Sequence, residues 1–233
     1  MSLRQGIRGN AADVVIGDTQ GMFVQSLNIT LNGDYNDPDD YDLDLNNDGL
    51  ADITFRSIVM GSPQLGTSPR SFIRSLHANA SMWMESFADT TFLINGTSTL
   101  VNNGYVWFIE SATHSCTQLN PSDSVLEINE NAFVMPVDAG YTLIYGSDFV
   151  STLDYQPFIR NNFSGELNQV SSNADTIFYT SDSSFNECRL FPQGTYEYIG
   201  VKLKVNGNDK LGWIKFKITG DKIISIVESA ILN

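Results

Sequence analysis

The residues best suited to chemistry in this 233-residue chain are oxygen donors that recur at every second position ahead of a glycine. Asp44, Asn46 and Asp48 occupy the first, third and fifth places of the D-x-[DN]-x-[DN]-G pattern of calcium loops. Gly49 takes the sixth place, where the chain of such a loop turns sharply. Carboxylate and amide oxygens are ligands that calcium prefers, so this spacing predicts a calcium site.

The residues after Gly49 extend this predicted site and distinguish it from an EF-hand. Leu50 can offer its carbonyl oxygen, and Asp52 adds a carboxylate. Calcium takes about 6 to 8 oxygen ligands, so water or outside donors would complete the shell. An EF-hand would carry its bidentate glutamate at the position of Phe55, and the β-branched and aromatic residues over 53–60 predict a strand instead of a helix. The alternative is a surface turn rich in Asp and Asn.

Charged residues are unevenly distributed along the chain. Of the 27 acids, eight Asp lie between positions 34 and 52, while all six Lys of the 13 bases lie between 202 and 222; the net charge is -14. A negative field disfavours nucleic acid and anionic membranes as partners, because both require basic patches. The clustered Asp residues repel one another unless a cation or the lysine-bearing segment neutralises them. This is a second argument for calcium, and a loop of this open type works at extracellular calcium levels, so we expect a secreted or cell-surface protein.

Signatures of enzymes are missing from the sequence. No nucleophile elbow, zinc-protease motif, P-loop or dinucleotide-binding glycine motif occurs. Zinc sites usually need three or four nitrogen or sulfur ligands, whereas the chain has two histidines and two cysteines, His77, His114, Cys116 and Cys188. The cysteines could form one disulfide or remain two thiols. We therefore expect a non-enzymatic role.

The alternative from another functional class is a polysaccharide hydrolase. Such an enzyme needs only two carboxylates about 5 to 9.5 Å apart, a distance that a sequence does not give. The candidate acids are Glu85, Glu110, Glu127 and Glu197.

Aromatic residues could supply a platform for a sugar ring. Trp83, Trp107 and Trp213 are most simply core residues. Trp213, however, shares strand parity with Lys215 and Lys217, so we expect it to be exposed and take these three residues as the predicted ligand contacts. The lysine strip is most simply a solvated face that balances the acidic loop, and a site for acidic glycans is the alternative.

Alternation of apolar and polar residues predicts strands at both ends of the chain. Leu27, Ile29 and Leu31 alternate with polar residues over 22–31. The same alternation over 199–227, with turns at 206–209 and 220–221, predicts a three-stranded antiparallel meander. One face of this meander belongs to the core, and the other carries lysines and Trp213.

The middle of the chain is less regular. Gly and Pro predict a loop over 61–70. Residues 71–87 fit both helical and strand spacing; we favour strands, with Phe72 and Met84 on the buried face. Further short strands are predicted over 91–94, 100–109, 125–128, 141–145 and 176–179, and polar surface loops near 111–124 and 161–175.

These patterns together predict an all-β fold. With many short strands and no convincing helix, we expect one mostly antiparallel β-sandwich domain of jelly-roll kind over residues 1–233, with 1–12 as a loose N-terminal segment. No run of 18 apolar residues occurs, so membrane insertion is not expected.

Four stretches carry a resemblance to a group of known proteins. Residues 42–55, 137–144, 198–203 and 211–216 resemble, in this order, segments of secreted β-rich extracellular proteins common in Bacteroidetes-type bacteria. The resemblance implies export and a β fold, and it implies no reaction. The loop is also similar to the calcium loops of dockerins and integrin-type propeller repeats, although it occurs once here. We therefore expect a secreted, calcium-stabilised protein that serves in surface interaction, with an extracellular glycan or surface polymer as its partner.

Overall fold

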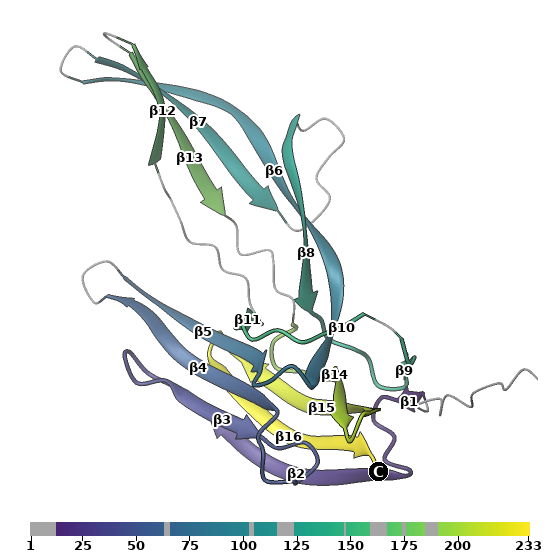
Figure 1. The fold of residues 1–233 in the computed structure, drawn as a ribbon. Coiled ribbons are helices and arrows are strands. Elements are labelled where there is room, and N and C mark those ends of the chain that lie inside the picture. Colours follow the sequence, from purple (N-terminus) through teal and green to yellow (C-terminus); the bar gives the residue numbers. More distant parts are fainter. Residues whose placement is uncertain are drawn as a thin grey trace, which may run out of the picture. The chain divides into compact units, whose positions relative to one another are not determined.

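The chain divides into two compact units in a computed structural model (Figure 1). The structure describes residues 13–62, 66–102, 105–115, 124–146, 148–158, 167–173, 176–184 and 191–233. Unit 1 comprises Met1–Glu85, Val134–Phe158 and Leu190–Asn233, and unit 2 comprises Ser86–Phe133 and Ile159–Arg189. The single domain over residues 1–233 stays a prediction.

The described residues form strands and no helix, so the predicted all-β class is confirmed. In unit 1 the strands are β1 (Val14–Val15), β2 (Met22–Leu31), β3 (Asp39–Leu43), β4 (Ile53–Ser62), β5 (Gly66–Ser75), β9 (Thr142–Leu143), β10 (Phe149–Val150), β11 (Gln156–Pro157), β14 (Tyr196–Val205), β15 (Asn208–Thr219) and β16 (Ile223–Leu232). Strand β6 (Ala80–Asn102) runs from unit 1 into unit 2, and β8 (Ser124–Val134) pairs with it. The other strands of unit 2 are β7 (Tyr105–Ser115), β12 (Leu167–Asn173) and β13 (Thr176–Ser184).

The first sheet of unit 1 contains the start of β6 followed by β14, β15, β16 and β2. Strands β14, β15 and β16 form the antiparallel meander that the sequence predicted. Asn206 and Gly207 join β14 to β15 with φ of 51° and 82°. Two left-handed residues in a two-residue connection make the type I′ turn that suits the twist of a hairpin.

The second sheet of unit 1 has the order β11, β5, β4, β3. Its inner face packs on the first sheet through the aromatic rings of Phe55, Phe158, Phe191 and Phe216, whose contacting pairs have centroids 4.9 to 6.1 Å apart. Two sheets with a shared aromatic core are the arrangement of a β-sandwich. The jelly-roll order of connections stays a prediction.

The face of the first sheet that points away from this core is also covered near Trp213. A second apolar cluster combines residues of the sheet with residues of the segments around 14–16 and 137–143: Val14, Ile16, Trp83, Val137, Leu143, Leu211, Trp213 and Ala230. Trp213 is 1% exposed, and its Nε1 donates to Asp18 O at 3.1 Å. The expectation that Trp213 is exposed is therefore wrong. Strand parity gives the face of a residue, but segments distant in sequence cover that face at this point.

The edge of the first sheet carries a bulge. The register of β16 with both of its neighbours shifts between Ile226 and Glu228: Val227 is an extra residue relative to β15, whereas Leu27 and Asn28 of β2 both stand opposite Val227, so β2 has the extra residue there. Asn28 has φ of 52°, in the left-handed region. Among the described residues, β2 has a strand partner on one side only. A bulge bends the strand that contains it, so this edge is kinked.

Two predictions for the middle of unit 1 need correction. The loop predicted over 61–70 does not span that range, because β4 continues to Ser62 and β5 begins at Gly66. Strands over 71–87 are confirmed, with a turn between β5 and β6. Phe72 is not on the inner face, however: Ser71, Ile73 and Ser75 are buried there, and Phe72 packs on Tyr155 at the outer face.

In unit 2, β6 pairs antiparallel with β7, β7 pairs parallel with β13, and β13 pairs antiparallel with β12. The polar stretches predicted as loops are partly strand, since β7 reaches Ser115 and β12 begins at Leu167. Serine and threonine side chains do not prevent backbone pairing, so polarity alone did not separate loop from strand here. The part of the chain that the structure describes offers no helix long and apolar enough to cross a membrane.

Candidate functional site

The 44–52 loop joins β3 to β4 and lies against the edge of the first sheet. Gln25 of β2 donates its side-chain amide to Asp44 O at 2.7 Å and to Leu45 O at 3.1 Å. Asp52 N donates to Leu43 O at 2.8 Å, which closes the base of the loop. The loop therefore links the two sheets at the edge formed by β2 and β3.

The backbone of the loop wraps around the carboxylate of Asp44. Gly49 N donates to its Oδ2 at 2.7 Å, and the N–H groups of Asp48 and Asn46 donate to its Oδ1 at 3.2 and 3.3 Å. Asn47 and Gly49 reach this arrangement with φ of 58° and 92°. A glycine takes such a φ without steric cost, which agrees with the sharp turn predicted at this position.

Asn46 and Asp48 lie on the exposed side of the same loop. Asn46 Nδ2 donates to Asp48 Oδ2 at 2.9 Å, and Leu50 N donates to Asp48 Oδ1 at 2.9 Å. The hydrogen bond from Asn46, followed by that from Leu50, holds the pKa of Asp48 below its ordinary value of 3.8. The carboxylate of Asp48 is therefore ionised and open to solvent.

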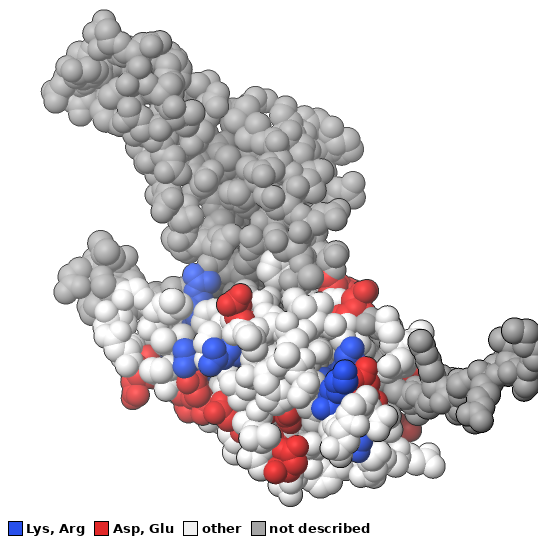
Figure 2. All heavy atoms as spheres, viewed as in Figure 1, with Lys and Arg blue, Asp and Glu red and all other residues white. Residues whose placement is uncertain are grey.

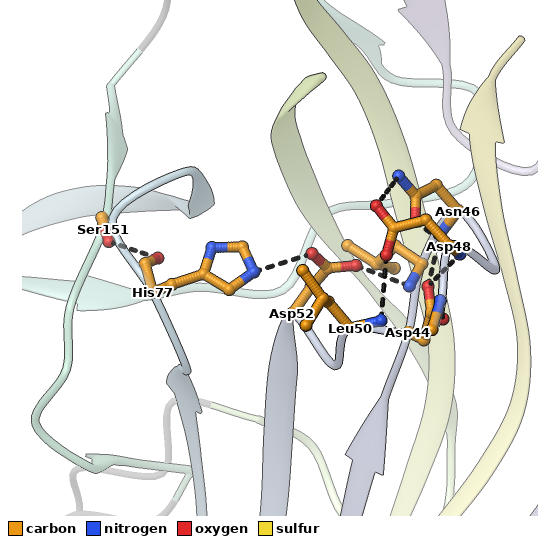
Figure 3. Close-up of polar contacts among 9 residues, drawn as sticks. Asp44, Asn46, Asp48, Leu50, Asp52, His77 and Ser151 are labelled. Atoms are coloured by element: carbon orange, nitrogen blue, oxygen red, sulfur yellow. Dashed lines mark hydrogen bonds and ion pairs between the residues drawn. The ribbon is translucent and has the colours of Figure 1, made fainter. Parts of the chain in front are cut away.

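Asp52 differs from the other acids of the loop because it is buried. Its Oδ2 accepts from Leu45 N at 2.7 Å, and its Oδ1 lies 3.0 Å from Nε2 of His77 (Figure 3). Burial raises the pKa of Asp52 above 3.8, and the contacts with Leu45 and His77 oppose this rise. The charges of Asp44 and Asp48 raise it further.

Sequence reasoning missed the position of His77. This residue lies in the turn between β5 and β6, where its carbonyl accepts from Ser151 Oγ at 3.2 Å. The neighbouring Leu76 N donates to Asp52 O at 2.8 Å. Figure 3 shows Asp52 between His77 on one side and the remainder of the loop on the other. No local pattern could reveal this contact, because β4 and β5 separate the two residues in the chain.

The loop has the type of donor atom that a hard cation needs, but the arrangement of these donors matches a cation site less closely. The side-chain acceptors of Asp44, Asn46, Asp48 and Asp52 are oxygens, as calcium requires, and a carboxylate oxygen that accepts one N–H retains another lone pair. Both oxygens of Asp52 already have partners, Leu45 and His77. Within the described residues, no three His, Cys, Asp or Glu side chains converge as a metal-binding group.

The second predicted contact region contains different residues in the structure. Lys215 and Lys217 lie on the outer face of the first sheet, as Trp213 does. They lie past the segments that cover Trp213. Lys217 pairs across strands with Tyr196, and Lys215 with Tyr198. Lys217 Nζ lies 5.0 Å from the Tyr196 ring centroid, and Lys215 Nζ lies 5.3 and 5.5 Å from the rings of Tyr196 and Tyr198. We refer to these four residues as the lysine–tyrosine face.

Exposure distinguishes the two tyrosines of this face. Tyr196 is 54% exposed. Tyr198 is half-buried and packs edge-on against Trp213, with ring centroids 5.4 Å apart. Tyr196, and not Trp213, is therefore the exposed aromatic residue beside the two lysines.

The remaining predicted site residues add little to either the 44–52 loop or the lysine–tyrosine face. Glu85 is exposed, and Glu197 accepts from Thr195 Oγ1 at 2.8 Å. Only the backbone is described for Trp107, Glu110, His114 and Glu127, and both cysteines lie outside the described residues. The hydrolase alternative stays a prediction.

Charged side chains of both signs are interspersed on the molecular face seen in Figure 2, with many uncharged residues between them. Among the described residues, the ion pairs are Arg56 with Asp40 and the contact of His77 with Asp52. No carboxylate of these residues lies within 4.0 Å of the ammonium groups of Lys215 or Lys217.

No protein-family model matches this chain, and the curated proteins and the solved structures contain no significant match to it. The resemblance to secreted bacterial β-rich proteins therefore stays a prediction. Two features remain as the basis for a function: the 44–52 loop and the lysine–tyrosine face.

Proposed function

We propose that this protein is a secreted or cell-surface β-sandwich, stabilised by one calcium ion, that serves in surface interaction by contacting a glycan or surface polymer. The observation that carries the proposal is the 44–52 loop, whose backbone turns three N–H groups toward the carboxylate of Asp44. This fixes Asp44 beside Asn46 and Asp48, the other donors of the calcium pattern.

A cation would also relieve an electrostatic conflict. The charges of Asp44 and Asp48 raise the pKa of the buried Asp52, which shows that the three carboxylates act on one another. We assign Asp44, Asn46, Asp48, Leu50 and Asp52 as the residues that would hold calcium. The ion would supply positive charge to the loop, while Gln25 and His77 would hold the loop against both sheets.

Thermal unfolding tests the calcium site. Binding to the folded state alone stabilises it by about 2.7 kcal/mol at about 100 Kd of free ion, which corresponds to a rise in Tm of about 5–10 °C for a chain of this size. We expect this rise when calcium is added after chelation, and a smaller rise with magnesium.

The matched variants are Asp48→Ala and Asp42→Ala. Both remove one exposed carboxylate, but Asp42 lies on β3 outside the calcium pattern. We expect Asp48→Ala to lose most of the calcium-dependent rise and Asp42→Ala to retain it. Equal rises in the two variants would refute the assignment of Asp48.

The lysine–tyrosine face supports the contact with a glycan. An exposed tyrosine offers an aromatic surface on which a sugar ring can stack, and the two lysines add donors without a carboxylate partner in the described part of the chain. Both lysines are positioned by cross-strand pairs with the two tyrosines in the meander.

A binding assay against polysaccharides tests this face. We expect Tyr196→Ala and Lys217→Gln each to weaken retention on a polysaccharide that the parent protein binds. Lys204→Gln is the control, because Lys204 is an exposed lysine of the same sheet outside the face. If the control weakens retention as much as Lys217→Gln, net charge and not this face is responsible.

A further inference from the structure

A third cluster lies on the outer face of the second sheet and belongs to neither feature above. Its centre is Tyr155, whose ring lies under two guanidinium groups: Arg56 Cζ is 4.5 Å and Arg74 Cζ 4.4 Å from the ring centroid. Strand β11 pairs with β5 through Gln156 and Ile73, which places Tyr155 beside Arg74. Phe72 packs on the same ring, with centroids 5.8 Å apart.

The two arginines share one ring but differ in their acceptors. Arg56 donates through Nε and Nη2 to both oxygens of Asp40, at 2.7 and 2.6 Å. Arg74 has no carboxylate within 4.0 Å among the described residues, and its Nε is buried without a hydrogen-bond acceptor. Buried polar groups of folded proteins usually have a hydrogen-bond partner, so the unsatisfied guanidinium of Arg74 is the one for which we look to an external acceptor.

We propose that Arg74 and Tyr155 form a binding site for a carboxylate carried on a sugar ring, as in a uronic acid. A guanidinium presents parallel N–H donors that match the two oxygens of a carboxylate, and Asp40 occupies that position on the neighbouring Arg56. Tyr155 and Phe72 are half-buried and lie beside Arg74, so they offer apolar surface to the ring that carries the carboxylate.

The site is independent of calcium and of the lysine–tyrosine face. Tyr155 is held by the 152–158 segment, in which Ser75 N donates to Thr152 O at 2.8 Å and Phe158 N to Ser71 O at 3.1 Å. None of these contacts involves the 44–52 loop. The binding of a sugar acid here is therefore expected to be the same with calcium and with chelator.

Nuclear magnetic resonance of the nitrogen-15-labelled full chain tests the proposal, because the Nε–H signal of Arg74 shifts when an acceptor pairs with its guanidinium. Glucuronate is the probe, glucose lacks the carboxylate, and acetate lacks the ring. We expect glucuronate to shift the Arg74 signal saturably, acetate to bind about tenfold more weakly and glucose to leave the signal unchanged, since charge-assisted pairing and ring contact are both required.

Two conservative variants separate the site from general charge. Arg74→Lys keeps the charge and loses the planar fork, so we expect about a tenfold loss of affinity. Arg70→Lys is the control on the same strand, because among the described residues the guanidinium groups over the Tyr155 ring are those of Arg56 and Arg74 and not that of Arg70. Unchanged affinity in Arg74→Lys, an equal loss in Arg70→Lys, acetate binding as tightly as glucuronate or no saturable shift would each overturn the proposal.

Discussion

At the scale of single residues, Asp52 shows how a buried acid can connect a loop to the body of the fold. Its two oxygens contact Leu45 within the loop and His77 beyond β5, and its carbonyl accepts from Leu76. Burial raises its pKa, so its ionised form is less stable in the folded state than in water. The loop is therefore held by a residue whose charge is unfavourable unless a cation accompanies it.

This raised pKa predicts how stability depends on pH in the presence of chelator. As pH rises above 3.8, Asp52 loses its proton in the unfolded chain first, because its pKa is higher in the folded chain. The contribution of Asp52 to the free energy of unfolding is therefore complete below pH 3.8 and is lost as pH rises through the folded pKa. The lowered pKa of Asp48 acts below 3.8 with the opposite sign. In urea unfolding from pH 3.8 to neutrality, we expect Asp52→Asn to remove part of this fall in the free energy of unfolding.

Asp42→Asn serves as the control, because it removes a carboxylate from an exposed position of β3. The free energy of unfolding of Asp52→Asn should show a smaller pH slope than that of this control. Identical slopes would mean that Asp52 does not titrate differently in the folded and unfolded chains.

At the scale of elements, β15 is buried on both of its faces over residues 211–214. Its even positions face the aromatic core, and Leu211 and Trp213 belong to the outer cluster. Gly212 stands between these two, paired with Ile231 of β16. A Cβ there would clash with the carbonyl oxygen of Ala230 and lie 3.0 Å from Ile231 Cα, so the two strands approach closely only because this residue is glycine.

Gly212→Ala is therefore expected to destabilise the protein by about 1–3 kcal/mol, the usual cost of overpacking a filled core. Chemical denaturation would measure the loss. Thr219→Ala, at the exposed end of the same strand, is the control and should change stability by less than about 0.5 kcal/mol. A free energy of unfolding equal to that of the control would show that β15 and β16 can separate without cost.

Local alternation predicted the elements better than it predicted what covers them. The strand over 22–31, the meander and the turn at Asn206 follow from residues adjacent in sequence, and all are confirmed. The burial of Trp213 depends on segments around 14–16 and 137–143, and the contact of His77 with Asp52 depends on the β4–β5 hairpin. Such contacts arise from tertiary packing, which the spacing of one strand does not encode.

At the scale of the whole molecule, chain connectivity joins the two compact units. Strand β6 begins in unit 1 and continues into unit 2, and the chain passes between the units again at residues 133–134, 158–159 and 189–190. Neither unit is a continuous piece of sequence. If one unit unfolded alone, a strand that both units share, such as β6, would stay folded over only part of its length.

We therefore expect calorimetry to show one cooperative transition, with equal calorimetric and van't Hoff enthalpies. Calcium should move the whole transition, because the 44–52 loop would stabilise a unit that does not unfold alone. Two transitions, of which calcium moves one, would contradict the single domain that the sequence predicted.

The kink at Asn28 has a consequence for the behaviour of the protein in crowded solution. An open, straight strand edge is a template on which a second chain can add its own strand, and repeated addition leads to insoluble assemblies. Asn28, with its left-handed φ, lies where β2 has one residue more than β16, and it interrupts β2 near its middle, so another chain meets two short segments that differ in direction. This bend would act as a safeguard that keeps separate copies of the protein from joining edge to edge.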